Sequence, residues 1–248
     1  MAFFNRVSKF IISTRPLEES KSDCSILARK GLDSHPSPAM KILYKNKIPK
    51  ISPYDAIVLT SRHATYSIKR LNIETMPVYC VGSSTAKVAR KNGAKNLLIG
   101  NSDIKALANL VSKTLSRDSR ILWLSGNYVL DNFSPLLKQF EISVDKFNVY
   151  ISKPMEFIDH KSIELITNNK VKVILFYSSE STKIWMKLIK NANLYDKIKL
   201  INLVGISNKT FSSISEEKDF KYYLSRRKRR ASVLAKAIEI FKMPEISK

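Results

Sequence analysis

The sequence contains the same pattern twice. An apolar stretch, a helix-like stretch and a second apolar stretch ending at Gly-x-Ser occur in residues 55–87 and again in residues 172–210. In each copy, small hydroxyl residues follow the first apolar stretch, so that Ser61 corresponds to Ser178 and Gly82 to Gly205. A duplication on this scale predicts two similar α/β domains in one chain.

The composition indicates a globular protein. With 248 residues, 44% of them hydrophobic, and only six glycines, the chain can form a core in each domain, and collagen-like, fibrous and disordered classes are excluded. No apolar run approaches the roughly 18 residues of a membrane helix, and the first residues lack a signal-peptide core. We therefore expect a cytoplasmic protein without a membrane partner. Cys24 and Cys80 lie far apart and predict two buried, reduced thiols.

Strands alternate with helices along the chain, which predicts parallel β-sheets flanked by helices. The last third begins with a helix and lacks a first strand, which the N-terminal residues supply. The sequence therefore predicts a discontinuous domain with a second domain inserted into it. The predicted segments are residues 1–37 plus 154–248 for the first domain, residues 41–150 for the inserted domain, and linkers at about 36–41, next to Pro36 and Pro38, and at about 150–155.

Small polar residues gather where the predicted strands end. Ligands bind at the carboxyl ends of the strands of parallel sheets, where helix N-termini offer free N–H groups to carboxylates or phosphates. Capping without a ligand explains any single turn of this kind, but several such turns favour a large ligand with many anionic groups. The candidate binding residues are Arg15, Thr60, Ser61, Gly82, Ser83, Ser84, Thr85, Ser125, Gly126, Ser178, Ser179, Gly205 and Ser207.

Conventional catalytic motifs are missing from the sequence. It has no GxGxxG or GxxxxGK[ST] phosphate loop and no GxSxG elbow, which disfavours nucleotide binding and a serine nucleophile. The three histidines lack the spacing of metal ligands, so no metal site is expected. If the protein is an enzyme, it works mainly by orienting a reactive substrate.

The charge balance favours an anionic partner. Forty-three basic residues against 21 acidic ones give a formal net charge of +22, although lysines spread along the whole chain explain much of the excess. The densest basic run is Arg226 to Arg230, with the sequence RRKRR. It is either a solvated loop or a contact for nucleic acid.

The order and spacing of several short motifs resemble the uroporphyrinogen-III synthase family from about residue 10 to residue 241. The motifs are Thr14-Arg15-Pro16, Asp55 with Thr60-Ser61, Val78 with Gly82 and Thr85-Ala86, Ile121 to Gly126, Val149-Tyr150, Leu175 and Phe176 with Ser178, and Val204-Gly205 with Ser207. The resemblance implies two α/β domains joined by a two-stranded linker, with an active site in the cleft between them.

The resemblance also implies a reaction. In this family hydroxymethylbilane, a linear tetrapyrrole with eight carboxylates, loses water and closes to uroporphyrinogen III with inversion of ring D, as a step of haem biosynthesis that uses no cofactor. Tyr150 matches the family tyrosine proposed to protonate the departing hydroxyl, with aromatic packing as the alternative. The residues matching cleft positions that bind substrate carboxylates are Ser61, Thr85, Ser178 and Ser207. We expect a monomer, with the upstream hydroxymethylbilane synthase as a candidate partner.

The sequence departs from the family pattern in the second copy. Tyr177-Ser178 replaces Thr-Ser, and residues 205–209, Gly-Ile-Ser-Asn-Lys, replace Gly-Pro-x-Thr-Ala, which affects the expected hydroxyl contacts there. Arg15 is expected to pair either with a substrate carboxylate or with a strand end. Two other classes stay open, a basic nucleic-acid-binding protein and an anion-binding module without catalysis. Nucleic acid is the less favoured partner, because only Tyr222 and Tyr223 precede the basic run.

Overall fold

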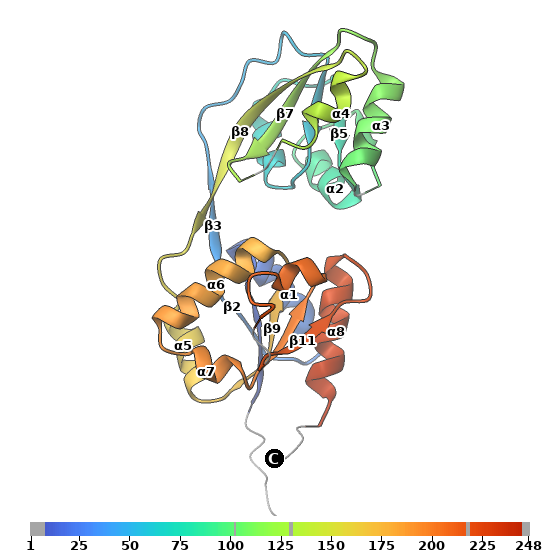
Figure 1. Ribbon diagram of the computed structural model, residues 1–248. Helices are drawn as coiled ribbons and strands as arrows, with labels where there is room; N and C mark the ends of the chain where they lie inside the picture. Colours follow the sequence, from blue (N-terminus) through green and yellow to red (C-terminus); the bar gives the residue numbers. More distant parts are fainter. Residues whose placement is uncertain (1–7, 102, 129–130, 217–218, 245–248) are drawn as a thin grey trace, which may run out of the picture. The chain divides into compact units, whose positions relative to one another are not determined.

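The computed structural model describes residues 8–101, 103–128, 131–216 and 219–244 (Figure 1). The chain divides into two compact units. The terminal unit consists of Met1–Lys41 and Lys153–Lys248, and the central unit consists of Ile42–Ser152. Each unit contains one β-sheet with helices beside it, which confirms the predicted α/β class.

The sheet of the terminal unit has five parallel strands in the order β11-β10-β9-β1-β2. The strands are β1 (Phe10–Ser13), β2 (Ser34–Pro36), β9 (Val171–Phe176), β10 (Asn202–Gly205) and β11 (Lys221–Leu224). In the register, Ile12 of β1 lies opposite Ile174 of β9 on one side and His35 of β2 on the other. The sheet therefore joins the two ends of the sequence.

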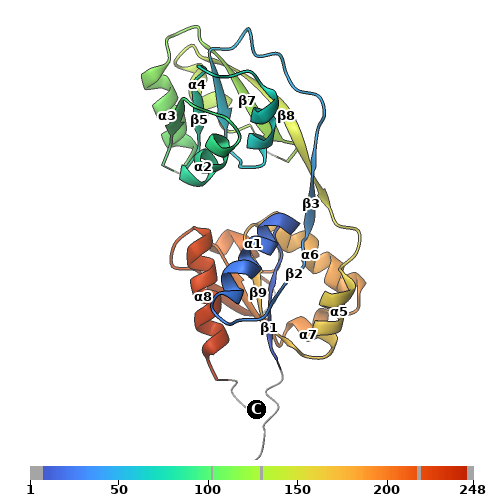
Figure 2. The same cartoon turned by 180° about the vertical axis from the view of Figure 1, so that it is seen from behind.

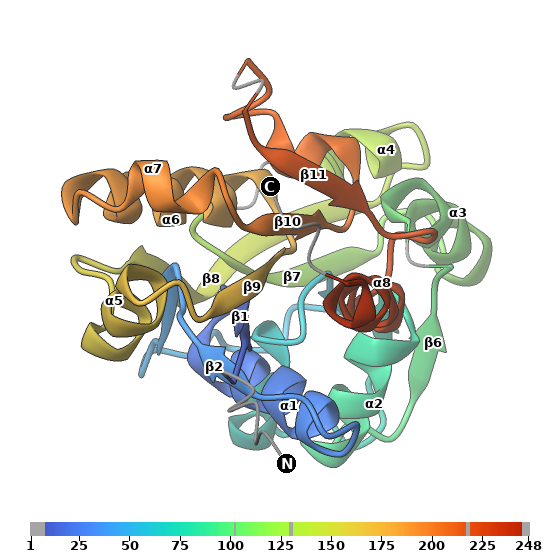
Figure 3. The ribbon, with the colours of Figure 1, turned by 90° about the horizontal axis from the view of Figure 1, so that it is seen from below.

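Helices cover both faces of this sheet (Figure 3). One face packs against α1 (Leu17–Ala28) and α8 (Arg230–Lys242), and the other against α5 (His160–Thr167), α6 (Ser179–Asn191) and α7 (Tyr195–Ile198). Side chains alternate between the faces, so that Val173 and Leu175 lie in the first core while Ile174 and Phe176 lie in the second. A strand buried on both faces needs apolar residues at every position.

The sheet of the central unit has six strands in the order β3-β8-β7-β4-β5-β6. The strands are β3 (Met40–Tyr44), β4 (Ala56–Leu59), β5 (Val78–Cys80), β6 (Leu97–Ile99), β7 (Arg120–Gly126) and β8 (Ser143–Pro154). Strands β4 to β8 are parallel. One face packs against α3 (Ile104–Thr114) and α4 (Ser134–Lys138), and the other against α2 (Ser83–Lys91) and the 3₁₀ helix η1 (Ala64–Arg70).

The chain passes from one unit to the other in β3 and returns at the end of β8 (Figure 1, Figure 2). The two segments are antiparallel, because the Lys45 amide donates to the Val149 carbonyl and the Met155 amide to the Ala39 carbonyl. At the start of the expected first linker, Pro36 ends the short strand β2, which the sequence did not predict. Proline is tolerated there because β2 is an edge strand.

The two sequence copies differ in their helices. An α-helix was expected after β4, but the structure has η1, and after β10 it has only the short 3₁₀ helix η2 (Asn208–Phe211). In η1, the Thr65 hydroxyl donates to the Arg62 carbonyl and the Ser67 hydroxyl to the Ala64 carbonyl, both at 2.6 Å. Hydroxyls that bond to carbonyls three residues earlier compete with α-helical hydrogen bonds and favour the tighter turn.

The expectations for the thiols are met in part. Cys80 is fully buried, and burial raises its pKa to about 12. Cys24 is partly exposed instead of buried, because it lies beside the inward face of α1. Neither thiol forms a disulfide. Within the described ranges, every helix is too short or too polar to cross a membrane.

Candidate functional site

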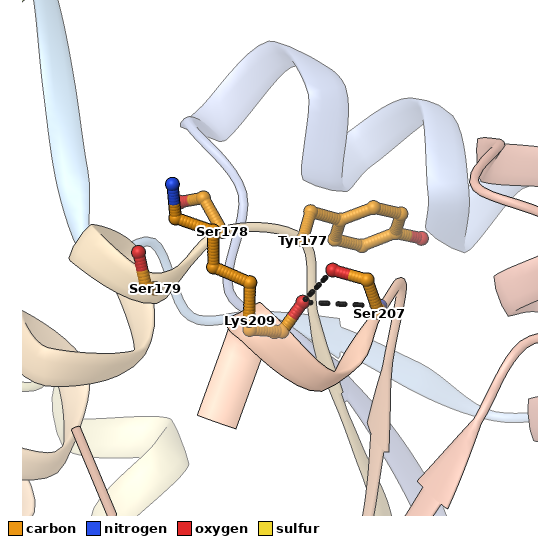
Figure 4. A pocket seen from close by; sticks show the side chains of 6 residues that line it. Tyr177, Ser178, Ser179, Ser207 and Lys209 are labelled. Carbon is orange, nitrogen blue, oxygen red and sulfur yellow. Dashed lines mark hydrogen bonds between the residues drawn. The ribbon is translucent and has the colours of Figure 1, made fainter. Parts of the chain in front are cut away.

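Strands β9 and β10 lie side by side and end at the same edge of the terminal sheet, where the residues that follow them form a hollow of about 230 Å³. We call it the serine pocket. It is lined by Tyr177, Ser178, Ser179, Ser207, Lys209 and Thr210 (Figure 4). Three residues predicted from the sequence, Ser178, Ser179 and Ser207, thus come together in one pocket.

The serines of this pocket cap the turns that follow the strands. The Ser178 side chain accepts a hydrogen bond of 3.1 Å from the Ser181 amide at the start of α6. The Ser207 amide donates to the Thr210 hydroxyl at 3.2 Å, as part of a capping box on η2. Because the first amides of an α-helix lack acceptors within it, the start of α6 offers hydrogen-bond donors to an anion.

Lys209 adds a positive charge to the serine pocket. It is exposed, and Figure 4 shows its side chain running from η2 toward Ser178. The sequence by itself shows at position 209 only a lysine where the family pattern has an alanine. The residues around Lys209 in the sequence do not distinguish it from the many other lysines. It lines the pocket only because β9 pairs with β10, which brings distant segments together.

A buried carboxylate lies next to the serine pocket. Asp23 of α1 is 0% exposed and accepts four hydrogen bonds, which define the Asp23 cluster. The donors are the Ser13 hydroxyl at 2.8 Å, the Tyr177 hydroxyl at 3.0 Å, Arg230 Nε at 2.6 Å and Arg15 Nη1 at 3.4 Å. Paired in this way, a carboxylate can be buried without the cost of an isolated charge.

The Asp23 cluster fixes one wall of the serine pocket. The Arg15 guanidinium lies over the Tyr177 ring, 4.8 Å from its centroid. Burial and the charge of Asp23 raise the pKa of Tyr177 well above its ordinary value, so its hydroxyl stays protonated and donates to Asp23. The Arg15 side chain thus pairs with Asp23 of α1 rather than with a strand end, and its contact with a substrate carboxylate stays a prediction.

In the central unit, Tyr150 packs against Gly126. The register between β7 and β8 shifts after Ser125, so that Gly126 lies opposite Tyr150. A Cβ atom at Gly126 would lie 2.5 Å from carbons of the tyrosine ring, which is closer than real contacts allow. The ring of His63 lies 5.4 Å from the Tyr150 ring, tilted by 57°. Tyr150 is 5% exposed and lies in the core of the central unit beside Gly126 and His63.

The terminal unit repeats this arrangement with another aromatic residue. A Cβ atom at Gly205 would lie 2.5 Å from the ring of Phe211. The glycines predicted as ligand contacts, Gly126 and Gly205, thus leave room for an aromatic ring of the protein itself. The sequence singled out these two glycines but did not show that each is needed to make room for an aromatic ring.

The other strand ends of the central unit form a second group of polar residues. Thr60 accepts a hydrogen bond of 3.1 Å from the Trp123 indole, and Ser61 accepts one of 3.2 Å from the His63 amide. Gly82 is the N-cap of α2 and has no side chain to cap it. Beyond it, Ser83 and Ser84 are exposed, whereas Thr85 is buried.

The family model of uroporphyrinogen-III synthase HemD matches residues 24–235. The chain belongs to this family. Members of the uroporphyrinogen-III synthase family are enzymes of haem biosynthesis, and this chain is one of them. A comparison with curated proteins gave no match.

Solved structures of other uroporphyrinogen-III synthases share the fold. The enzyme from Helicobacter pylori is 13% identical with a TM-score of 0.65, and the match covers 94% of this chain and 99% of that one. A mutant of the enzyme from Thermus thermophilus is 13% identical with a TM-score of 0.53, covering 95% of this chain and 99% of that one. At such identities the likeness concerns the fold alone.

One residue expected to bind a ligand is enclosed by the protein. Ser125 is fully buried, and its hydroxyl donates to the Asn148 side chain at 2.9 Å. Helices cover both faces of this sheet, so the side chain of Ser125, one residue before the end of β7, is enclosed whichever face it points to. We therefore remove Ser125 from the binding residues.

Metal binding has no visible support in the part of the chain that the structure describes. There, no group of three histidine, cysteine or carboxylate side chains comes together as metal ligands would. The clustered polar groups are hydroxyls, amides and cations, which are ligands for carboxylates.

Proposed function

We propose that the strand ends of the two units bind the carboxylates of hydroxymethylbilane and orient it for closure to uroporphyrinogen III. The serine pocket carries this proposal. It combines hydroxyl groups, the start of α6 and the cation of Lys209 in one hollow. A carboxylate needs several hydrogen-bond donors and a nearby positive charge, and this pocket supplies both. In the central unit, we assign the corresponding role to Ser61 and to the start of α2 at Gly82, Ser83 and Ser84.

The reaction places a clear demand on the protein. When the substrate loses its hydroxyl as water, it becomes an electron-poor azafulvene that closes spontaneously to the symmetrical isomer. The type III product requires attack through the substituted carbon of ring D, by way of a spirocyclic intermediate. Holding the reacting carbons in that geometry lowers the barrier by about 7–11 kcal/mol in the best cases. We therefore assign most of the rate enhancement, and all of the selectivity for the type III isomer, to the orientation of the bound substrate.

Departure of the hydroxyl also requires one proton, and we propose Tyr150 as its donor. The phenol proton leaves with the hydroxyl as water, and the proton released when the pyrrole ring regains aromaticity restores the phenol. The ring is fixed between Gly126 and His63, so its hydroxyl has a defined position. Positioned proton donors contribute about a hundredfold or more in rate.

The isomer ratio tests the proposed function. Purified protein is mixed with freshly prepared hydroxymethylbilane, and the products are oxidised to porphyrins and separated by chromatography. We expect mainly the type III isomer, formed faster than the spontaneous closure. Type I product alone, at the uncatalysed rate, would contradict the assignment.

The Tyr150→Phe variant tests the proton donor separately. We expect kcat to fall about a hundredfold, with type III still the main product, because orientation is retained. Tyr54→Phe is the matched control, since Tyr54 lies before β4 at the opposite edge of the same sheet and donates to Asp145. Full turnover by Tyr150→Phe would leave the tyrosine with a packing role only.

The cellular setting follows from the same proposal. We propose a monomer that works in the cytoplasm and receives its substrate from the upstream hydroxymethylbilane synthase. The unpaired state of Cys24 and Cys80 suits a reducing compartment. Sedimentation at several protein concentrations tests the monomer, and co-sedimentation with the upstream synthase tests the contact.

A further inference from the structure

The basic run of the sequence leaves the terminal sheet at the edge that holds the serine pocket. Four exposed residues, Arg226, Arg227, Lys228 and Arg229, follow β11, and we call them the arginine loop. Because β11 is parallel to β10, both strands end at the same edge. The Ser225 amide donates to the Gly205 carbonyl at 3.0 Å, which brings the start of the loop to the strand that leads into Ser207.

The arginine loop is held in place at both ends. The Ser225 hydroxyl donates to the Arg227 carbonyl at 2.9 Å, and the Arg227 amide donates to the Ser232 hydroxyl at 3.1 Å. Arg230, the last residue of the run, is bound to Asp23 at 2.6 Å and to the Ser22 hydroxyl at 2.9 Å. The loop therefore presents its charges from a fixed backbone.

The positive charges of the loop are not held in close ion pairs. Among the residues that the structure describes, none of the four has a carboxylate within 4 Å, because Asp23 pairs with Arg15 and Arg230. Glu239 pairs with Lys236 at 2.7 Å, and this bond, with a smaller contribution from the charge of Arg226, lowers its pKa. Four adjacent cations repel one another, and a bound polyanion relieves that repulsion.

We propose that the arginine loop is a carboxylate-binding wall of the substrate site, beside the serine pocket. The inference rests on the proposed function, in which the ligand is a linear tetrapyrrole with many carboxylates. The serine pocket is too small to hold all of these carboxylates. An arginine guanidinium binds a carboxylate through two parallel hydrogen bonds. The loop extends the binding edge from β9 and β10 to β11 and raises affinity for the polyanionic substrate.

Nucleic acid, the rival ligand for this loop, lacks a stacking surface here. Single-stranded binding sites combine cations with aromatic rings that stack on bases. The tyrosines beside the loop pack into the unit instead: Tyr222 lies against one core and donates to the Ile214 carbonyl at 2.6 Å, and Tyr223 lies against the other core. The observations therefore favour the carboxylate ligand.

Two variants of equal charge test the inference. The loop variant changes Arg226, Arg227, Lys228 and Arg229 to glutamine. The control variant changes four exposed cations at the opposite edge of the same unit, namely Arg29, Lys30, Lys221 and Lys242, to glutamine. Thermal unfolding checks that both variants fold. If the loop variant does not fold, a double variant with Arg226→Gln and Arg227→Gln replaces it.

Steady-state kinetics with hydroxymethylbilane give the first readout. We expect the loop variant to raise KM about tenfold at low salt while kcat stays within about twofold and type III remains the main product. The double variant should raise KM about threefold, and the control variant should leave it within about twofold. Because salt screens exposed charges, the difference between loop and control should shrink at 0.5 M salt.

Binding of uroporphyrin III, the stable aromatic porphyrin with eight carboxylates, gives a readout that needs no turnover. Fluorescence titration should show about tenfold weaker binding by the loop variant than by the control. Equal affinities, together with equal KM values, would overturn the inference. So would a loop variant that loses only its retention on single-stranded DNA. Wild-type protein that makes only type I product would overturn the proposed function, whereas the porphyrin titration would still decide this inference.

Discussion

Asp23 shows how one side chain can organise a pocket without lining it. It is buried, yet it accepts hydrogen bonds from Ser13, Arg15, Tyr177 and Arg230. Through these bonds it fixes Tyr177, which lines the serine pocket, and Arg230, which follows the arginine loop. Glu19 lies on the same inward face of α1, where burial raises its pKa.

Replacing Asp23 should therefore cost more than replacing any one of its partners. We expect Asp23→Asn to lower the free energy of unfolding by about 3–5 kcal/mol, because it leaves two arginines without their buried counter-charge. Tyr177→Phe, which removes one hydrogen bond, should cost about 1 kcal/mol. Urea unfolding measures both. Equal losses for the two variants would show that Asp23 does not hold the arginines in place.

At the scale of residues, the sequence predicted what is local. Ser178 and Ser207 were identified as caps, because a cap depends on the next three residues. Asp23 was missed because its partners Tyr177 and Arg230 lie 154 and 207 residues away in the sequence.

At the scale of elements, a side-chain hydrogen bond joins strand β2 to helix α5. His35 of β2 donates from Nε2 to Asp159 Oδ1 at 2.7 Å, and Asp159 also caps α5 through the Ser162 amide. Burial raises the pKa of Asp159, but the bonds from His35 and Ser162 outweigh it and lower the pKa from 3.8 to about 2. The edge strand is thereby fastened to a helix that begins more than a hundred residues later.

This pair should make the terminal unit sensitive to acid. A carboxyl group whose pKa is lower in the folded state contributes stability above its unfolded pKa, near 4, and that stability is lost as the pH falls toward about 2. Because the Asp159 side chain is 37% exposed, solvent screening reduces the effect to about 1 kcal/mol. Urea unfolding at pH 5 and pH 3 should show that Asp159→Asn removes this part of the pH dependence and that His35→Gln reduces it. An unchanged dependence in both variants would contradict the assignment.

The elements that the sequence missed are those with weak burial signals. Strands buried on both faces, such as β4 and β9, read as continuous apolar runs and were predicted correctly. The edge strands β2 and β11 have only partly buried or exposed residues, so their sequences carry no such run. The 3₁₀ helices were taken for α-helices because hydroxyl competition for carbonyls leaves little trace in the apolar pattern.

At the scale of the whole molecule, the two units differ in how the chain builds them. The central unit is one continuous stretch, Ile42–Ser152, whereas the terminal unit combines both ends of the sequence. The family motifs and the duplicated pattern predicted this class of fold. They did not predict which strand ends would supply a pocket, because that depends on strand order across distant segments.

The central unit should fold by itself. We expect a fragment of residues 42–152 to unfold cooperatively in urea, because both faces of its sheet are covered by its own helices. Circular dichroism of the fragment measures the transition. A fragment without a cooperative transition would show that the central unit depends on the rest of the chain.

Pairing of β1 with β9 has a consequence for synthesis on the ribosome. Thr14 meets Leu175, which is 161 residues farther along the chain. At roughly 5–20 residues per second, the nascent N-terminal strand must wait on the order of ten seconds for its neighbour to emerge. During that interval β2 and α1 can contact β1, but the side of β1 that pairs with β9 has no native partner, so we expect nascent chains to depend on chaperones until β9 has been synthesised.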